Sequence, residues 1–269
     1  MKKISTLQVS NIVALILTLI MNGVSQSDIF PNTIGELGES RAIFFLPAGY
    51  VFEMWGVIYT GLIAYVIYRA RPSQRDGDVV QSIGWWFVVS CMANIIWLIL
   101  FLYDLVWLST IAMIVILIAL LMIYTRLGIG TKSVSLAEKW AVHIPFSIYL
   151  GWISVATVAN FSTALYTSGA VTSFIGINAD IWATTMLIVA AILAVGMLYF
   201  RRDSAYALVI VWASYGIYAR PFDTDLYEPL ANLNAGLVNT MSLSIAIVVG
   251  IGAIITLGLS MRNWQSASA

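Results

Sequence analysis

The chain has 269 residues, of which 61% are hydrophobic and 10% are charged, and its 13 basic and 13 acidic residues leave no net charge. Soluble domains are about 45–50% apolar and about 25% charged, so this composition indicates a protein whose apolar surface is solvated by lipid. A chain without a basic patch is not expected to bind nucleic acid. The single cysteine, Cys91, and the single histidine, His143, exclude a disulfide within the chain and a multi-histidine metal centre, and we expect no resident cofactor.

Apolar stretches near the ~20 residues needed to cross a bilayer define the predicted elements. In chain order they cover residues 8–27, 47–68, 83–102, 105–125, 141–164, 179–200, 204–219 and 237–260. The first stretch follows two lysines, but no small-residue cleavage pattern comes after it, so we expect a retained helix and not a signal peptide. The sequence therefore predicts an all-α, polytopic transmembrane bundle of about eight helices.

The charges of the loops support this number and give an orientation. With the N-terminus in the cytoplasm, every basic residue except Arg41 and Arg220 falls on the cytoplasmic side, as the positive-inside rule requires. Omitting one central helix would invert all later loops and destroy this pattern. The outer loops are acidic and contain Asp28, Glu36, Glu39, Asp104, Asp180, Asp223, Asp225 and Glu228. We therefore expect a multi-pass protein of a bacterial inner or plasma membrane, with both termini cytoplasmic.

The ten tryptophans fall into two groups. One group lies near predicted helix ends, where an interfacial belt is the usual role of tryptophan; it comprises Trp85, Trp86, Trp107, Trp140, Trp182 and Trp264. The other group lies nearer mid-span, where an indole N–H needs a hydrogen-bond partner; it comprises Trp55, Trp97, Trp152 and Trp212. Two interpretations of the second group stay open, namely buried aromatic packing and a ligand pocket with aromatic walls.

Polar residues in the same stretches favour the pocket. Asn94 lies three residues before Trp97, and Asn160 lies eight residues after Trp152, so each shares a helix face with its tryptophan. Glu53 lies two residues before Trp55, and an ionisable side chain within a membrane helix indicates a functional site. Alternatively, the helix begins after Glu53 and its carboxylate lies in the outer loop.

Three motifs in these stretches resemble the tryptophan-rich sensory protein and translocator protein family (TspO, the peripheral benzodiazepine receptor family). In the second stretch, Pro47 is followed by Trp55 and, four residues later, by Tyr59; the third contains Asn94-Ile95-Ile96-Trp97 and then Phe101. The fifth runs from Tyr149 through Trp152 and Ala156-Thr157 to Asn160. The chain departs from the family pattern at Glu53-Met54, where the family has Gly-Pro. The resemblance covers about residues 8–165.

The resemblance implies a five-helix ligand-binding unit over residues 1–168, with residues 169–269 as an additional three-helix segment packed in the same membrane domain. It implies a protein that binds a hydrophobic planar molecule, such as a porphyrin, a haem-like compound or a sterol, as a sensor or carrier. Loop 28–46 would be the lid of the pocket. Together with Glu53, the residues expected to bind the ligand are Tyr50, Phe52, Trp55, Tyr59, Asn94, Trp97, Tyr149, Trp152 and Asn160.

Other function classes have less support. A small-molecule transporter or channel is the main alternative, with Glu53 and the polar residues Asn239, Ser242 and Ser244 of the eighth stretch along the path. No pattern of catalytic residues indicates an enzyme, although porphyrin degradation has been suggested for the resembling family. The expected partners are membrane lipids and a hydrophobic small molecule. Gly250, Gly252 and Gly258 would suit either a homodimer interface or packing within the chain.

Overall fold

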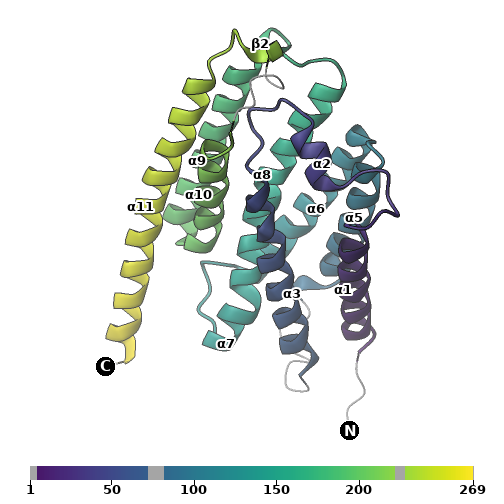
Figure 1. Ribbon diagram of the computed structural model, residues 1–269. Helices are drawn as coiled ribbons and strands as arrows, with labels where there is room; N and C mark the ends of the chain where they lie inside the picture. Colours follow the sequence, from purple (N-terminus) through teal and green to yellow (C-terminus); the bar gives the residue numbers. More distant parts are fainter. Residues whose placement is uncertain (1–4, 72–81, 222–227, 269) are drawn as a thin grey trace. The chain divides into compact units, whose positions relative to one another are not determined.

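A computed structural model describes residues 5–71, 82–221 and 228–268, and the side chains of residues 261–268 lie outside this description. The predicted all-α bundle is confirmed, because every one of the predicted apolar stretches coincides with a helix (Figure 1). Several charges used for the orientation, at Lys2, Lys3, Arg75, Asp223 and Asp225, lie outside the described residues, as do the side chains of Arg262 and Trp264.

The long helices end where local sequence signals end them. They are α1 (Thr6–Val24), α3 (Met54–Ala70), α5 (Trp86–Leu102), α6 (Val106–Leu127), α8 (Ile144–Thr167), α9 (Ala179–Arg201), α10 (Ser204–Tyr218) and α11 (Ala235–Ser268). A capping box between Ser5 and Gln8 begins α1, and the carboxylate of Asp203 caps α10. Gly128 ends α6 in the left-handed conformation, with a φ of 64°, as is common at helix C-termini.

Short elements connect or extend these helices. They are α2 (Ile34–Glu39), η1 (Gly49–Glu53), α7 (Leu136–Glu138), the π-helical turn η3 (Lys139–His143), the strands β1 (Ser173–Phe174) and β2 (Ile177–Asn178), and η4 (Glu228–Leu230). Among the described residues, six helical segments are long and apolar enough to cross a membrane, whereas α5 and α10 are apolar but shorter. These lengths and compositions agree with an integral, multi-pass membrane protein.

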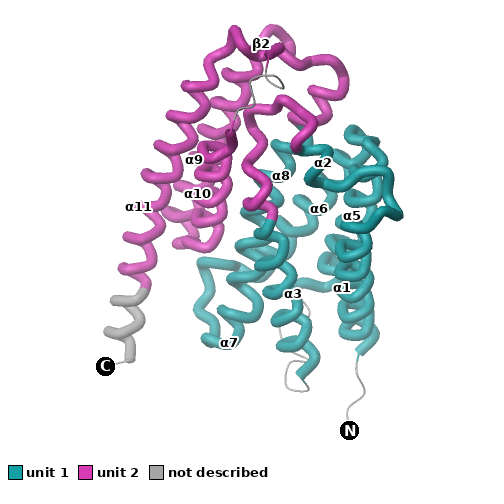
Figure 2. The backbone as a smooth tube through the Cα atoms, in the orientation of Figure 1, with its two compact units in different colours: residues 1–38, 53–161 teal, residues 39–52, 162–269 magenta. Residues whose placement is uncertain are grey.

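The contacts divide the chain into two compact units (Figure 2). Unit 1 comprises residues 1–38 and 53–161, and unit 2 comprises residues 39–52 and 162–269. The strap, which we define as residues 39–52, therefore belongs with the C-terminal helices, a grouping that no sequence signal indicated. The predicted division after residue 168 stays a prediction.

Unit 1 contains α1, α3, α5, α6 and most of α8. Helix α1 contacts α3 through buried polar groups: Gln8 Nε2 donates to the carbonyl of Arg69 over 2.9 Å, and Asn11 Nδ2 donates to the Tyr65 hydroxyl over 3.2 Å. A Cβ at Gly61 would come within 2.9 Å of Pro145 Cβ, so α3 approaches the start of α8 closely at this glycine. Close helix contacts at small residues are typical of membrane bundles.

Unit 2 contains α9, α10 and α11, which pack on one another, and the end of α8. The strap lies against α10, where the amide of Ala48 donates to the carbonyl of Gly216 over 3.0 Å. A Cβ at Gly252 would lie 3.1 Å from Leu198 Cδ1, so this glycine allows α11 to pack on α9. Gly258 has no neighbour within 4 Å of such a Cβ, and a homodimer through α11 stays a prediction.

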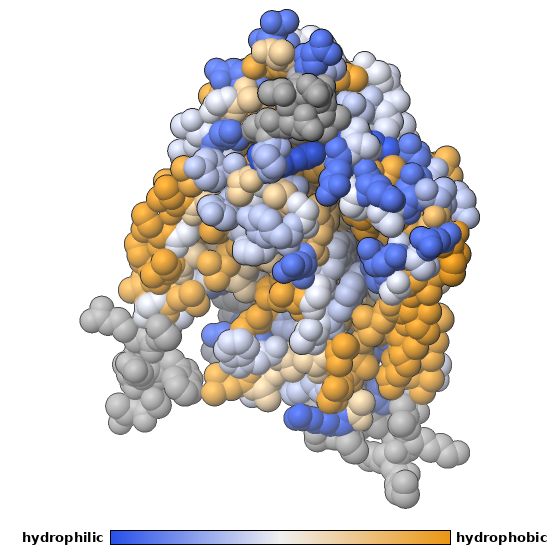
Figure 3. All heavy atoms as spheres, viewed as in Figure 1, coloured by the Kyte–Doolittle hydropathy of each residue, from blue (hydrophilic) through white to orange (hydrophobic). Residues whose placement is uncertain are grey.

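Apolar side chains cover the outward faces of helices in both units. Figure 3 shows them gathered over α1 in unit 1 and over α11 in unit 2, whereas polar side chains gather over the loops. In α1 the exposed residues include Val13, Ile16 and Ile20, and in α11 they include Val248 and Ile254. Such faces are expected where lipid, and not water, surrounds a helix.

Candidate functional site

A cluster of aromatic rings in unit 1 is centred on Trp55. The ring of Trp55 stacks on those of Tyr59 and Trp97, with centroids 5.6 Å apart in both pairs. It meets Tyr149 and Trp152 edge-on, at 6.1 and 6.2 Å. The structure thus brings together five of the predicted site residues from α3, α5 and α8, and we call these five rings the Trp55 cluster.

The depth of the rings in the protein differs across the Trp55 cluster. Trp97, Tyr149 and Trp152 are 4%, 2% and 1% exposed, whereas Trp55 and Tyr59 are only half-buried. Trp55 lies in the first turn of α3, at the end of a helix, where its side chain has fewer neighbours than a mid-helix ring. The three buried rings therefore form a fixed floor, and Trp55 covers it.

Asn94 supplies polar groups at the edge of the Trp55 cluster. Its Oδ1 accepts a hydrogen bond from Asn22 Nδ2 over 3.1 Å, and its side chain also interacts with the hydroxyls of Tyr59 and Tyr149. Within the described part of the chain, Asn94 Nδ2 and the Tyr59 hydroxyl oxygen are buried and form no hydrogen bond of standard geometry. Buried donors of this kind are rare unless they serve a ligand, an ion or a water.

Asn160 has a different role from Asn94, because both ends of its amide are engaged. Its Oδ1 accepts from Trp97 Nε1 over 3.0 Å, and its Nδ2 donates to Ser109 Oγ over 3.0 Å and to Thr110 Oγ1 over 2.7 Å. The side chain therefore ties α8 to α5 and α6 and fixes the orientation of the Trp97 ring.

The predicted residues just before α3 lie apart from this arrangement in the division of the chain. Tyr50 and Phe52 belong to unit 2, where the ring of Tyr50 meets that of Trp212 edge-on at 5.5 Å. Glu53 is exposed and immediately precedes α3, which begins at Met54. This corresponds to the alternative in which the helix begins after Glu53, and the interpretation of Glu53 as a buried mid-helix carboxylate is wrong.

The mid-span tryptophans find the partners that their indole groups need. Besides Trp97, Trp212 Nε1 donates to the carbonyl of Val51 over 3.2 Å. Of the predicted belt, Trp85, Trp107 and Trp140 are 55%, 47% and 68% exposed, which suits an interfacial position.

The polar residues proposed for a transport path are mostly engaged locally. In α11, Ser242 Oγ donates to the carbonyl of Asn239, and Ser244 Oγ donates to that of Thr240. Near the start of α8, His143 Nε2 lies 3.7 Å from the carboxylate of Glu138. Among the described residues, no group of three or more His, Cys, Asp or Glu side chains is placed to hold a metal ion.

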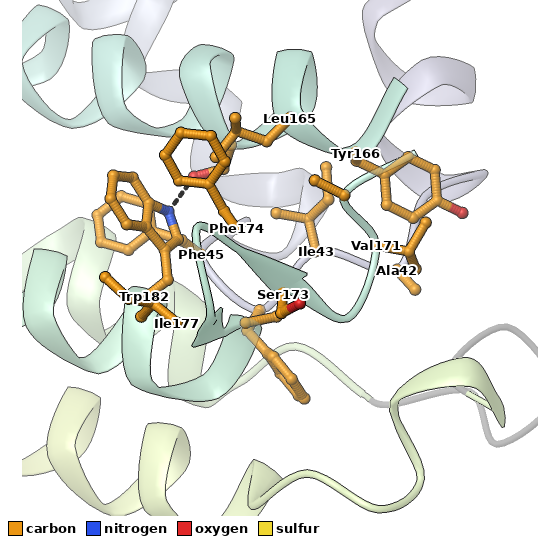
Figure 4. Close-up of a pocket in the computed structure, with 14 residues that line it drawn as sticks. Ala42, Ile43, Phe45, Leu165, Tyr166, Val171, Ser173, Phe174, Ile177 and Trp182 are labelled. Atoms are coloured by element: carbon orange, nitrogen blue, oxygen red, sulfur yellow. Dashed lines mark hydrogen bonds between the residues drawn. The ribbon is translucent and has the colours of Figure 1, made fainter. Parts of the chain in front are cut away.

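Unit 2 contains a pocket that the sequence did not indicate (Figure 4). Its walls come from residues 42–45 of the strap, the last turns of α8, residues 170–177 around the β1–β2 hairpin, and the first turn of α9. One wall is fixed by Trp182, whose Nε1 donates to Ser162 Oγ over 3.0 Å. The only hint in the sequence is the apolar pair Phe174-Ile175 in a short loop.

Arg220 fixes the strap at the same end of unit 2. Its Nη1 donates to the carbonyls of Ile43 and Leu46, and its Nη2 donates to that of Arg41, each over 3.3 Å. One guanidinium thus holds three carbonyls of a segment without regular secondary structure. This explains how one of the two basic residues on the predicted outer side is used.

With this geometry described, comparison with known proteins gives one match. A family model described as "TSPO-like protein" matches residues 8–258. The chain belongs to the TSPO-like family. The match includes α9, α10 and much of α11, beyond the residues that carry the motifs of the Trp55 cluster. No curated protein and no solved structure gives a match.

Proposed function

We propose that this TSPO-like membrane protein binds a hydrophobic, planar small molecule, a porphyrin-like or sterol-like compound, at the Trp55 cluster, as a sensor or carrier. The observation that supports the proposal is the convergence of Trp55, Trp97 and Trp152 from three helices. Pockets with mainly aromatic walls and a few convergent polar groups are typical of small-molecule sites.

The packing suggests how a flat molecule would enter. In the structure, Trp55 itself lies against Tyr59 and Trp97 as a flat ligand would, with near-parallel rings. Because Trp55 is half-buried at a helix end, its side chain is the one whose rotation opens the floor formed by Trp97, Tyr149 and Trp152. The ligand would then stack on indole faces in place of Trp55, or between Trp55 and the floor.

Polar groups would orient the ligand once it is stacked. Asn94 Nδ2 and the Tyr59 hydroxyl would donate hydrogen bonds to a carbonyl or carboxylate at the edge of the ligand. Asn160 would act indirectly, by holding Trp97. This division of roles refines the expectation that both asparagines contact the ligand.

The proposal includes loop 28–46 as the lid and a membrane orientation with both termini in the cytoplasm. Residues 28–38 of the loop belong to unit 1, whereas residues 39–46 belong to the strap of unit 2. Closure of the lid would therefore involve the segment that Arg220 holds.

Quenching of tryptophan fluorescence by protoporphyrin, with the protein in nanodiscs, tests the proposal. We expect saturable quenching for the parent protein and its loss in the Trp55→Ala/Trp152→Ala double variant. The matched control is Trp85→Ala/Trp107→Ala, which removes two exposed tryptophans and should keep the parent affinity.

A third variant separates binding from folding. Trp55→Phe keeps an aromatic ring in the cluster, so it should fold and bind protoporphyrin about ten-fold more weakly, because it loses part of the stacking surface. Unchanged affinity in the double variant, measured against protein-free nanodiscs, would place the porphyrin elsewhere and overturn the proposed site.

A further inference from the structure

The pocket of unit 2 has walls without charge. No Asp, Glu, Lys or Arg lines it, and its empty space measures about 400 Å³, including the mouth. Ligand pockets usually measure about 300–1,000 Å³. A charged ligand would lose its hydration without gaining an ionic partner, so the walls select against ions.

Aromatic side chains form much of this pocket. Phe44, Phe45, Tyr166, Phe174 and Trp182 contribute to its lining. Phe174 and Trp182 meet edge-on, with ring centroids 6.2 Å apart, and lie next to each other in Figure 4. Because the Trp182 N–H is already donated to Ser162, the ring can offer its face and edge and not a free donor. Such walls favour edge-to-face and stacked contacts with another ring.

The walls are also held in place before any ligand binds. Arg220 fixes the carbonyls of strap residues on one side, as described above. On the other side, the β1–β2 hairpin turns through Ile175 and Gly176, whose φ values are 53° and 75°. Positive φ is costly for a β-branched residue such as Ile175 and is often found next to functional sites.

From these observations we propose that unit 2 carries a second small-molecule site, which binds a neutral compound with one or two aromatic rings. The site uses none of the residues of the Trp55 cluster and does not depend on the function proposed for that cluster. Its size suits a compound smaller than a porphyrin. Its ligand binds by ring contacts with Phe174 and Trp182, between the strap and the hairpin.

The test uses 2-naphthol as a neutral two-ring probe and the full chain labelled with 5-fluorotryptophan in nanodiscs. The ¹⁹F resonance of Trp182 is assigned with Trp182→Phe. We expect this resonance to shift saturably with 2-naphthol, while that of the exposed Trp107 does not. Parallel, non-saturating shifts of both resonances would mean partitioning into lipid and would overturn the proposal.

Two variants locate the probe. Ala170→Phe fills the pocket and should weaken binding at least ten-fold, whereas Ala231→Phe, at an exposed position of unit 2 outside the pocket lining, should not. Phe174→Leu keeps an apolar side chain but removes one ring, and it should weaken 2-naphthol binding several-fold even if Ala170→Phe does not fold. Parent affinity in Phe174→Leu would contradict ring recognition.

Two further measurements define the class of ligand and the independence of the site. If 1-decanol gives the saturable shift and 2-naphthol does not, the site takes an acyl chain and the aromatic assignment is wrong. The Trp55→Ala/Trp152→Ala variant should keep 2-naphthol binding, so failure of the porphyrin site and failure of this site are distinguishable.

Discussion

The Trp55 cluster of unit 1 and the pocket of unit 2 are built from the same kinds of side chain but packed differently. In the cluster, four rings lie within 6.2 Å of the Trp55 ring and occupy the space between α3, α5 and α8. In the pocket, aromatic side chains stand in the walls around open space. Aromatic content alone therefore does not distinguish a site that opens by ring rotation from one that is open already.

The largest expected effect comes from removing the central ring of the cluster. Trp55→Ala should lower the free energy of unfolding by about 3 kcal/mol, because four ring contacts are lost and a cavity is left. Trp182→Ala, in the pocket wall, should cost about 1–2 kcal/mol, since it loses one ring contact and one hydrogen bond. Reversible unfolding in mixed micelles, followed by circular dichroism, measures both; equal losses would remove the distinction between core and wall.

The two asparagines of the cluster offer the next comparison. Asn160→Leu should destabilise the protein by about 1–3 kcal/mol, because the Trp97 N–H and two hydroxyl groups lose their partner. Asn94→Leu should destabilise less, since only the bond with Asn22 is lost, but it should weaken protoporphyrin binding more. The same unfolding and quenching measurements decide; a larger binding defect in Asn160→Leu than in Asn94→Leu would reverse the roles assigned here.

Two glycines of unit 2 should respond to alanine with opposite signs. At Gly216 in α10, a Cβ would collide with Val51 Cγ2 and lie 3.1 Å from Pro47 Cβ, so Gly216→Ala should cost about 1–2 kcal/mol and loosen the strap. At Gly196 in α9 nothing lies within 4 Å, so Gly196→Ala should stabilise the helix by about 0.5 kcal/mol. Thermal unfolding in nanodiscs checks the signs; a neutral Gly216→Ala would mean that the strap does not pack tightly on α10.

The fold was predictable from the sequence, and the site only in part. Runs of apolar residues defined the helices, because a bilayer allows few other ways to satisfy the backbone. The pairing of Trp97 with Asn94 on one face also placed those residues correctly near Trp55. Nothing in the spacing could show that Asn160 is fully engaged, since its partners Ser109 and Thr110 lie on another helix.

The strap and the pocket could not be predicted for a related reason. Residues 39–52 lack the periodicity that reveals which surface a helix buries, and their position depends on single bonds to α10, such as that of Ala48 to Gly216. Glu53 illustrates the same limit at a helix start. An apolar run around it suggested burial, but the helix begins one residue later and leaves the carboxylate exposed.

The smallest expected effect distinguishes the two halves of loop 28–46. In unit 1, the Glu36 carboxylate accepts from the Thr33 amide over 2.7 Å and from its hydroxyl over 2.9 Å. The backbone bond first, and the hydroxyl bond second, lower the pKa of Glu36 below its ordinary value of 4.5. Because the pKa is lower in the folded state, the stabilisation is present above about pH 4.5 and is lost as the pH falls through the folded-state pKa.

Glu36→Gln should therefore reduce the amide protection of α2 slightly at pH 7, and the difference from the parent should vanish in acid. Hydrogen exchange of residues 33–39, compared between variant and parent at each pH, measures this, with Glu39→Gln as the control at the other end of α2. Residues 41–46 should keep their protection throughout, because Arg220 holds their carbonyls and stays charged at every pH used. Parallel loss of protection in both halves would show that the loop opens as one piece, so that the boundary between the units at residue 39 has no counterpart in its motion.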